Sequence, residues 1–308
     1  IARRQRQMCI RDRAHILHLP SSLEVTNFAH GQAQLIKYEI PEGSILDGTK
    51  LMDLGTRHHA NILIGAVERD DEVTIPSGDF VLRKGDKLSF VGERRHTKEF
   101  FSHIGVNTHS VKNTLIIGGG KAAYYLAKQL ISRGIKVKII ENSFERCEEL
   151  SILLPDAVII NGDGTEQALL KEEGIETCQS FVPLTGIDEE NIMLTLYAKQ
   201  VSNAKVITKL NRITFTNVIN SLDLGSVISP KYITSEAIIA YVRAKKNSMN
   251  CNIETLYHMY DSRVEAIEFF VSENSNVTDI PLRDLKLKKH LLICFINRNG
   301  KIIIPTGN

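Results

Sequence analysis

Apolar positions between residues 113 and 246 change period repeatedly, from short β-rich runs to longer helical patterns. The β-rich runs are residues 113–118, 135–141, 156–162, 179–185, 204–210 and 226–230. Between the first two, residues 121–134 place apolar side chains about every 3.6 residues and end at Gly134, a helix-terminating signal. Regular alternation of strands and helices predicts βαβ units and a parallel sheet covered on both faces. The predicted fold class is therefore α/β.

A glycine-rich turn follows the first predicted strand and opens the first predicted helix. Residues 118–123 read GGGKAA and fit G-x-G-x-x-A, the Rossmann dinucleotide-binding pattern. Gly118 permits a tight turn, Gly120 lets a pyrophosphate approach the backbone, and Ala123 allows close helix packing. The phosphates would lie at the helix N-terminus, where Lys121 adds a positive charge. The alternative is a glycine turn that packs a strand on a helix and binds nothing.

Further polar or loop residues follow the later strands. Glu141 ends the second strand, where a carboxylate accepts hydrogen bonds from ribose hydroxyls and repels a 2′-phosphate, which favours NAD(H) or an adenosine nucleotide over NADP. Asp163 follows the third strand, where adenine or ribose would lie, although an ordinary Asp-Gly turn explains it equally well. Leu184 and Thr185 end the fourth strand and face the same crevice. Lys209 ends the fifth, either reaching a phosphate or remaining solvated.

Two regions that flank this α/β segment resemble each other. Residues 35–54 align without a gap with residues 266–285, and residues 60–79 align with 291–308 after short indels. Each copy predicts strand, short helix, strand, turn and strand, and the first copy adds a strand at 86–93 and a helix at 94–105. Residues 13–25 and 242–255 are predicted as corresponding upstream helices. Each copy is thus a small α+β module. The apolar stretches 61–67 and 291–296 predict sheet edges that associate into at least a dimer.

Composition excludes several other classes of protein. The net charge of +2 in 308 residues gives no electrostatic case for nucleic acid binding, and no apolar run is long enough for a membrane span. Five cysteines without CxxC spacing indicate reduced cytosolic thiols. No catalytic motif such as G-x-S-x-G is present. The histidines lack metal-ligand spacing and are interpreted as solvated: His58, His59, His96, His103 and His290.

The motifs NGDGTE (161–166), LTGIDEEN (184–191) and ISP (228–230), in this order between two repeat modules, resemble the TrkA family of regulatory subunits of bacterial potassium uptake. The resemblance implies binding of NAD(H), with ATP or ADP as further ligands. It assigns Gly118, Gly119, Gly120, Lys121 and Ala122 to the phosphates, Glu141 to ribose, and Leu184, Thr185 and Lys209 to remaining contacts. It also implies a ring-shaped homo-oligomer in the cytoplasm, peripheral on the inner face of the membrane and docked on a membrane-embedded potassium transporter subunit of the TrkH or TrkG kind.

The same resemblance suggests a domain organisation. Residues 1–13 are predicted to be a non-native tail, since residues 8–13 look like translated adapter DNA. Residues 14–30 would end a truncated first RCK N-domain and linker, 31–108 form a TrkA-C domain, and 112–232 form the Rossmann-like TrkA-N domain. Residues 233–250 would be a connecting helix, and 251–308 a second, truncated TrkA-C domain. The family pattern has a glycine where this chain has Ala123.

The predicted function is regulation of a potassium transporter by nucleotide binding, without catalysis. A dehydrogenase needs a substrate domain whose acid or base meets the nicotinamide, and the repeated module offers none. Two alternatives stay open: an NAD-dependent oxidoreductase, and the regulatory domain of another cation transporter such as a cation/proton antiporter.

Overall fold

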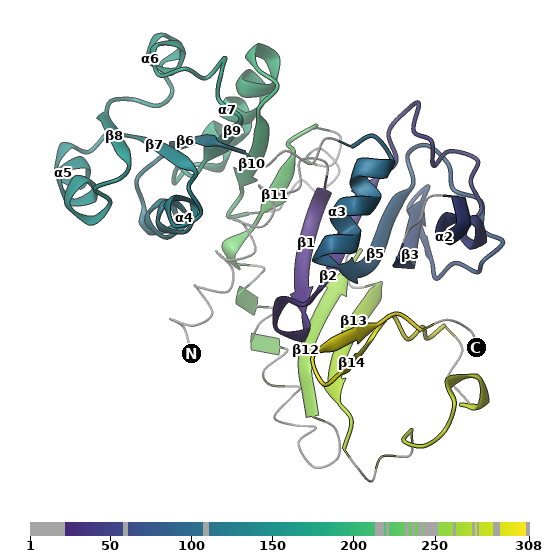
Figure 1. The fold of residues 1–308 in the computed structure, drawn as a ribbon. Helices are drawn as coiled ribbons and strands as arrows, with labels where there is room; N and C mark the ends of the chain where they lie inside the picture. Colours follow the sequence, from purple (N-terminus) through teal and green to yellow (C-terminus); the bar gives the residue numbers. More distant parts are fainter. Residues whose placement is uncertain are drawn as a thin grey trace. The chain divides into compact units, whose positions relative to one another are not determined.

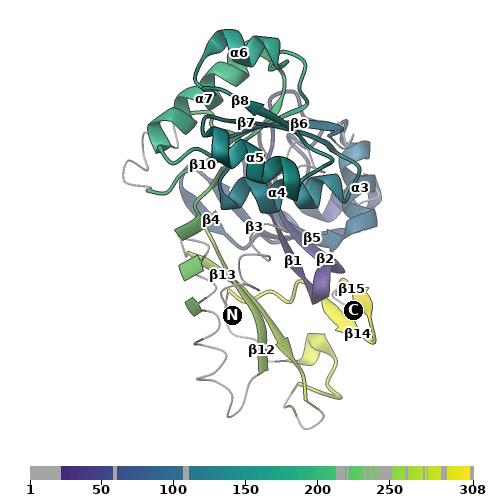
Figure 2. The same cartoon turned by 90° about the vertical axis from the view of Figure 1, so that its left-hand side faces the viewer.

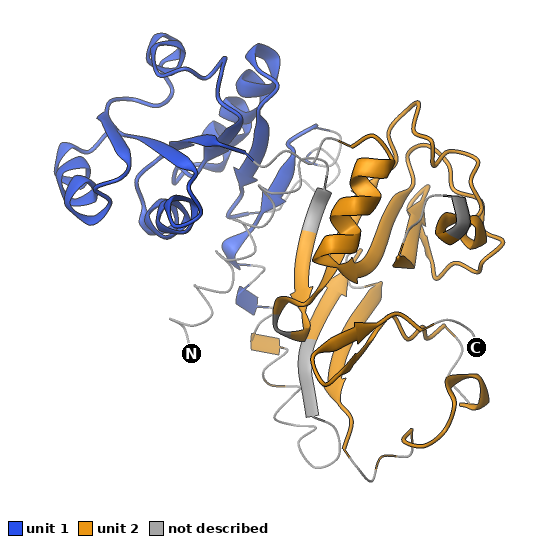
Figure 3. Ribbon diagram, viewed as in Figure 1, with its two compact units in different colours: residues 1–20, 109–235 blue, residues 21–108, 236–308 orange. Residues whose placement is uncertain are grey.

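The computed structural model describes residues 22–57, 61–106, 111–212, 219, 222–231, 234–235, 238–239, 242, 252–260, 263–272, 275, 277–285 and 290–305. The chain forms two compact units, which Figure 3 shows in different colours. Unit 1 comprises residues 1–20 and 109–235, and unit 2 comprises residues 21–108 and 236–308. The predicted tail at 1–13 lies outside the described residues, as does most of the predicted connecting helix at 233–250.

Unit 1 is built on a parallel six-stranded sheet with the order β11-β10-β9-β6-β7-β8. Its strands are β6 (Asn113–Ile117), β7 (Lys136–Glu141), β8 (Val158–Asn161), β9 (Ser180–Pro183), β10 (Lys205–Lys209) and β11 (Ser226–Ile228). The third strand in sequence lies at one edge and the sixth at the other, so the order is that of a doubly wound dinucleotide-binding sheet. The predicted α/β class and parallel sheet are confirmed.

Helices cover both faces of this sheet. They are α4 (Lys121–Ile131), α5 (Phe144–Leu153), α6 (Gln167–Glu172) and α7 (Asp188–Val201). Figures 1 and 2 show α4 and α5 on one face and α6 and α7 on the other. The apolar stripe of α4 is buried at Ala123, Leu126, Ala127 and Leu130, while Leu170 of α6 and Leu194 of α7 join the core on the opposite face. Because both faces are covered, the strands are almost continuously apolar.

Unit 2 contains an antiparallel five-stranded sheet with the order β1-β2-β5-β3-β4. Its strands are β1 (Ser22–Phe28), β2 (Ala33–Glu39), β3 (Ile62–Arg69), β4 (Glu72–Thr74) and β5 (Lys87–Glu93). The 3₁₀ turns η1 (Ala29–Gly31) and η2 (Leu51–Asp53) and the short helix α2 (Leu54–Arg57) connect them. Helix α3 (Arg94–His103) covers one face, where Phe101 contacts Tyr38 and Phe90 with ring centroids 5.3 and 5.7 Å apart.

The sequence repeat is also a structural repeat. The second copy contains β12 (Asn252–Met259), β13 (Val264–Phe270), η3 (Leu282–Asp284), β14 (Ile296–Arg298) and β15 (Lys301–Ile303). The alignment of Leu35 with Ala266 also superimposes both ends of β2 on those of β13, and η2 on η3. In this alignment Ala29, with φ 48°, is equivalent to Tyr260, with φ 52°. Both are non-glycine residues in the same uncommon backbone conformation. The β14–β15 hairpin likewise repeats the register of β3–β4.

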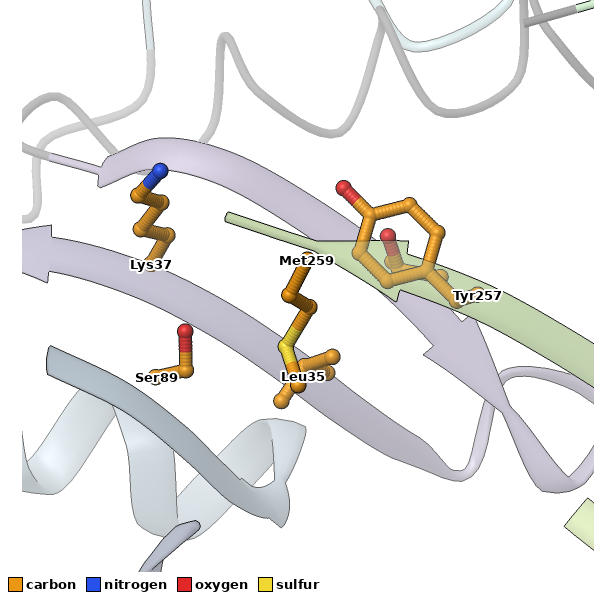
Figure 4. A pocket seen from close by; sticks show the side chains of 6 residues that line it. Leu35, Lys37, Ser89, Tyr257 and Met259 are labelled. Atoms are coloured by element: carbon orange, nitrogen blue, oxygen red, sulfur yellow. The ribbon is translucent and has the colours of Figure 1, made fainter. Parts of the chain in front are cut away.

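The two copies pack against each other within unit 2. The face of β2 that carries Ala33 and Leu35 joins Met259, Tyr260 and Ile302 in one apolar cluster. The hydroxyl of Tyr260 is 2.7 Å from Ser89 Oγ and donates to the carbonyl of Lys87 at 2.9 Å. Figure 4 shows side chains from both copies around a small cavity: Leu35, Lys37, Ser89, Tyr257 and Met259. Each copy therefore completes the core of the other.

One expectation about the two repeat copies is wrong. Residues 22–25 and 252–255, predicted within helices, lie in β1 and β12, because each pairs with the strand that follows it. The sheet therefore begins before residue 31, the boundary expected for the module. Of the apolar stretch 61–67, predicted as a sheet edge, only Val67 pairs with β4, while Ile64, Ala66 and Val67 are buried within the chain. Association through this stretch stays a prediction.

Candidate nucleotide-binding site

The candidate site lies at the carboxyl ends of the strands of unit 1. Strand order reverses between β6 and β9. From β6 the chain continues to β7 and β8 on one side of the sheet, and from β9 it continues to β10 and β11 on the other. In open parallel sheets the crevice at such a reversal is where ligands bind. All the predicted site residues follow or end a strand at this edge of the sheet.

The glycine turn after β6 contains one glycine that the backbone conformation requires, Gly118, and one that has free space beside it, Gly120. Gly118 has φ +92°, and a Cβ there would lie 3.2 Å from the carbonyl carbon of Leu184, so only glycine fits without strain. Gly120 is the N-cap of α4 with φ −64°, and a Cβ there would meet nothing within 4 Å. No side chain caps this helix end, and the neighbouring Lys121 side chain is exposed. The first turn of α4 thus has no side-chain cap and has free space beside Gly120, as an anion site requires.

Glu141 connects the end of β7 to the glycine turn. One carboxylate oxygen, Oε2, accepts a hydrogen bond from the Gly119 N–H at 2.5 Å, and Oε1 accepts from the Ser143 N–H at 2.8 Å. A carboxylate has about four lone-pair sites, so two remain for hydroxyl donors. The side chain is thus oriented by backbone groups and retains capacity for a ribose.

Three further predicted residues meet at the ends of β9 and β10. The Lys209 ammonium donates to the carbonyl of Thr185 at 2.8 Å and to that of Leu184 at 3.4 Å. Asn191 accepts from the Thr185 N–H at 3.0 Å and donates to the Lys209 carbonyl at 3.0 Å. This network makes the solvated reading of Lys209 wrong, because the ammonium fixes the loop that follows β9. Contact of these residues with a ligand stays a prediction.

Asp163 forms the turn that its sequence suggested as one of two readings. Its Oδ1 accepts from the N–H of Thr165 at 2.8 Å and from the Thr165 hydroxyl at 2.7 Å, and these hydrogen bonds lower its pKa. The adjacent Gly164 packs so closely on Ile117 of β6 that no Cβ fits between them. The turn therefore lies next to the glycine turn, and a ligand contact from Asp163 stays a prediction.

Two residues of this region were missed from the sequence. Arg146 of α5 donates through Nε to the Gly119 carbonyl at 2.7 Å and pairs with Glu149, which places a cation beside the glycine turn. Asn191 is fully buried and links the β9 and β10 loops. Arg146 belongs to no motif, whereas Asn191 ends the LTGIDEEN stretch, where a buried amide after an acidic helix start was a usable signal.

The described residues also bear on metal binding and on membrane insertion. Among the described residues, no three His, Cys, Asp or Glu side chains converge as a metal site would require. His58 and His59 lie outside the described residues. Likewise, none of the helices in the described ranges is long and apolar enough to span a bilayer.

A doubly wound parallel sheet with a glycine turn, an acid on the second strand and an open helix N-terminus defines a protein of the dinucleotide-binding class, here joined to an antiparallel α+β module. Residues 114–230 match the TrkA-N domain family, and residues 35–105 match the TrkA-C domain family. The chain belongs to the family of TrkA-N and TrkA-C domain proteins. The matched TrkA-C range is the first copy of the repeat, so a second TrkA-C domain at 251–308 stays a prediction.

Relatives of known name agree with this assignment. The chain is 32% identical over 296 residues to the Trk system potassium uptake protein TrkA homolog 1 of Methanosarcina mazei, covering 96% of this chain and 64% of that protein. It is 29% identical over 291 residues to TrkA of Halomonas elongata, covering 94% and 63%. The chain thus spans just under two thirds of the length of these relatives. The solved GsuK RCK domain superimposes with a TM-score of 0.55 at 19% identity, covering 81% of this chain and 54% of that one, which shows a shared fold.

Proposed function

We propose that this chain is the nucleotide-binding, regulatory part of a potassium uptake system. It binds NAD(H), and ATP or ADP, at the carboxyl ends of β6 and β9, and it acts by gating a membrane-embedded transporter subunit of the TrkH or TrkG kind. The observation that carries the proposal is the Glu141 carboxylate bound to the Gly119 N–H at 2.5 Å, beside the open N-cap at Gly120.

The geometry supports a dinucleotide whose ribose carries no 2′-phosphate. The open space over Gly120 and the uncapped first turn of α4 suit a pyrophosphate, whose charge the helix dipole and Lys121 stabilise. The two free lone-pair sites of Glu141 suit ribose hydroxyls and disfavour a 2′-phosphate. Gly118, Ala122, Asp163, Leu184, Thr185 and Lys209 complete the proposed crevice.

A regulatory role is supported by the kind of domain joined to the site. The relatives are named for potassium uptake, and the solved GsuK channel bound to NAD has the same fold, with a TM-score of 0.54. A ligand shifts a conformational equilibrium only by its different affinity for two states. Here the change would pass from unit 1 to the paired modules of unit 2, and from a homo-oligomer on the inner face of the membrane to the transporter subunit.

Two measurements on one sample test this proposal against an oxidoreductase. The chain has no Trp, so the fluorescence of reduced nicotinamide reports NADH binding without energy transfer from indole. We expect saturable enhancement that excess ATP competes away, and no loss of NADH absorbance over hours with oxo acids, aldehydes or ketones present. Sustained NADH oxidation at ordinary enzymatic rates, about 1 s⁻¹ or more, would favour the oxidoreductase.

The partner is tested by transport. Potassium uptake into proteoliposomes that contain the membrane subunit of the same system should change when NADH is added with this chain, and not with NADH alone. Flux that is indifferent to both would remove the regulatory role while leaving nucleotide binding intact.

A further inference from the structure

The two repeat copies meet at two equivalent places in unit 2, where a turn of one copy lies beside a hairpin of the other. At the first place Arg263, between β12 and β13, pairs with Glu68 of β3 and donates to the carbonyl of Asp71 in the β3–β4 turn. At the second place Gln32, the equivalent of Arg263, lies beside the β14–β15 turn, since a Cβ on Gly300 would be 3.8 Å from Gln32 Nε2. The two places can therefore be compared residue by residue.

The residues that close the first place by an ion pair have neutral equivalents at the second. The shared hairpin register makes Asn297 the equivalent of Glu68 and Lys301 the equivalent of Glu72. The ion pair of the first place thus corresponds to two amide side chains, Gln32 and Asn297. An acidic position of the hairpin has also become basic. The sequence of the second place therefore favours positive charge where the first place has a closed pair.

The second place contains an open cavity of about 380 Å³, within the size range of small-molecule sites. It is lined by Gln32, by Lys301 and by the first two residues of α3, Arg94 and Arg95. Nε of Arg95 donates to Glu99 at 2.9 Å. The side chains of Arg94 and Lys301 are exposed, and neither has a hydrogen bond or ion pair to another residue that the structure describes. Two such cations, one from each repeat copy, line the cavity.

This positive charge lies at an unfavourable end of α3. The N-terminus of a helix carries a partial positive charge, which favours acidic side chains there and disfavours basic ones. Helix α3 nevertheless begins with Arg94 and Arg95, and it has neither an acidic residue in its first turn nor a side-chain cap. Glu93 also lines the cavity, and its carboxylate lies 3.9 Å from His96 Nδ1. An anion bound between Arg94 and Lys301 would relieve the repulsion among these groups.

We propose that this cavity binds a phosphate monoester that carries hydroxyl groups. Arg94 holds the phosphate through its planar guanidinium and Lys301 through its ammonium, two cations that match a dianion. The amide of Gln32 and the carboxylate of Glu93 bind the hydroxyls. None of the described residues that line the cavity is aromatic, so no side chain stacks on a base, which favours a polyol phosphate over a nucleotide. A soluble sugar phosphate and the headgroup of an anionic lipid share this chemistry.

The first test measures hydrogen exchange with and without glycerol 3-phosphate. Peptides that cover residues 31–36 and 93–100 report the cavity, and peptides of α4 report the nucleotide crevice, which belongs to unit 1. Failure of one site is therefore seen separately from failure of the other. At a concentration ten times the dissociation constant, we expect exchange in the two cavity peptides to slow by up to about tenfold, because the bound state must open after the ligand leaves.

Variants at the cavity give the contribution of each cation in calorimetry. Arg94→Gln and Lys301→Gln should each weaken glycerol 3-phosphate binding about tenfold or more, since a charge-assisted hydrogen bond is lost. Lys301→Glu, which gives this hairpin the acidic residue that the first copy has at Glu72, should abolish binding. Lys98→Gln is the matched control, because it removes a positive charge from an exposed position of α3 that does not line the cavity. All four changes are at exposed side chains and should leave the melting temperature unchanged.

Co-sedimentation with vesicles that contain phosphatidic acid distinguishes the two sources of the phosphate. Binding of glycerol 3-phosphate that is lost in Lys301→Glu supports the proposal and assigns a soluble ligand. Vesicle binding that is lost in Lys301→Glu, without binding of glycerol 3-phosphate, supports it and assigns a lipid headgroup. Binding of neither would overturn the proposal. Binding that Lys98→Gln weakens as much as Lys301→Gln does would also overturn it, since the attraction would then be that of the general surface charge.

Discussion

Gly118→Ala should destabilise unit 1, although it adds one methyl group. The backbone of Gly118 has φ +92°, which a residue with a Cβ adopts at a cost of about 1 to 2 kcal/mol. The new Cβ would also lie 3.2 Å from the carbonyl carbon and oxygen of Leu184 and 3.3 Å from the nitrogen of Thr185. These are backbone atoms at the end of β9, and they cannot retreat without weakening the hydrogen bond of 2.8 Å from the Leu184 N–H to the Ile117 carbonyl.

The magnitude follows from these terms. Overpacking against a fixed backbone costs about 1 to 3 kcal/mol, and the lower entropy of the unfolded chain returns about 0.4 to 1 kcal/mol. The net loss is roughly 1 to 4.6 kcal/mol in the opening free energy of unit 1, or exchange about 5 to 2,000 times faster at a tenfold change per 1.4 kcal/mol. Gly120→Ala is the matched control in the same turn, since its φ is −64° and its Cβ meets nothing within 4 Å.

Hydrogen exchange of β6 and β9 peptides measures this loss locally, which matters because a two-unit chain need not unfold in one step. We expect Gly120→Ala to stay within about 0.5 kcal/mol of the original protein. Equal protection of β6 and β9 in the two variants would refute the conformational argument for Gly118.

Three further predictions test other contacts. Glu141→Ala should weaken NADH binding by about 1 to 3 kcal/mol in calorimetry, since charge-assisted bonds to the ribose are lost, and unchanged affinity would remove Glu141 from the site. Burial lowers the pKa of Lys205 from 10.5 to about 7, so the unfolded state binds more protons between these values and stability should rise with pH across that window. Lys205→Met should flatten this slope in urea unfolding at pH 7, 8.5 and 10, and an unaltered slope would contradict the assignment. Tyr260→Phe should cost unit 2 about 1 to 2 kcal/mol, measured by exchange of β5 peptides, because the bonds to Ser89 and Lys87 are lost; no change would mean that they contribute nothing.

The local features of unit 1 were predictable from its sequence. The α/β alternation, the tight turn at Gly118 and the position of Glu141 at the end of β7 all depend on neighbouring residues, and the structure has them there. Periodicity and turn chemistry act over a few residues, so one sequence is enough to read them.

Features that depend on distant pairing were not predictable in this way. The binding of Lys209 to the loop after β9 requires the strand order, which places β9 beside β10. Residues 22–25 and 252–255 become strands through hairpin pairing, which overrides their local pattern. The packing of one repeat copy on the other likewise joins residues far apart in the chain, such as Ser89 and Tyr260.

Calorimetric titration of the chain and of Gly120→Val with NADH tests the central claim most directly. A Cβ at Gly120 meets no protein atom within 4 Å, so the valine occupies space that the fold leaves open and that a pyrophosphate would need. Gly55→Val, at another glycine whose Cβ would meet nothing within 4 Å, is the control in unit 2. The account predicts saturable NADH binding to the original chain and to Gly55→Val, and no detectable binding to a folded Gly120→Val. Equal NADH affinity in all three proteins, or none in the original chain, would contradict it.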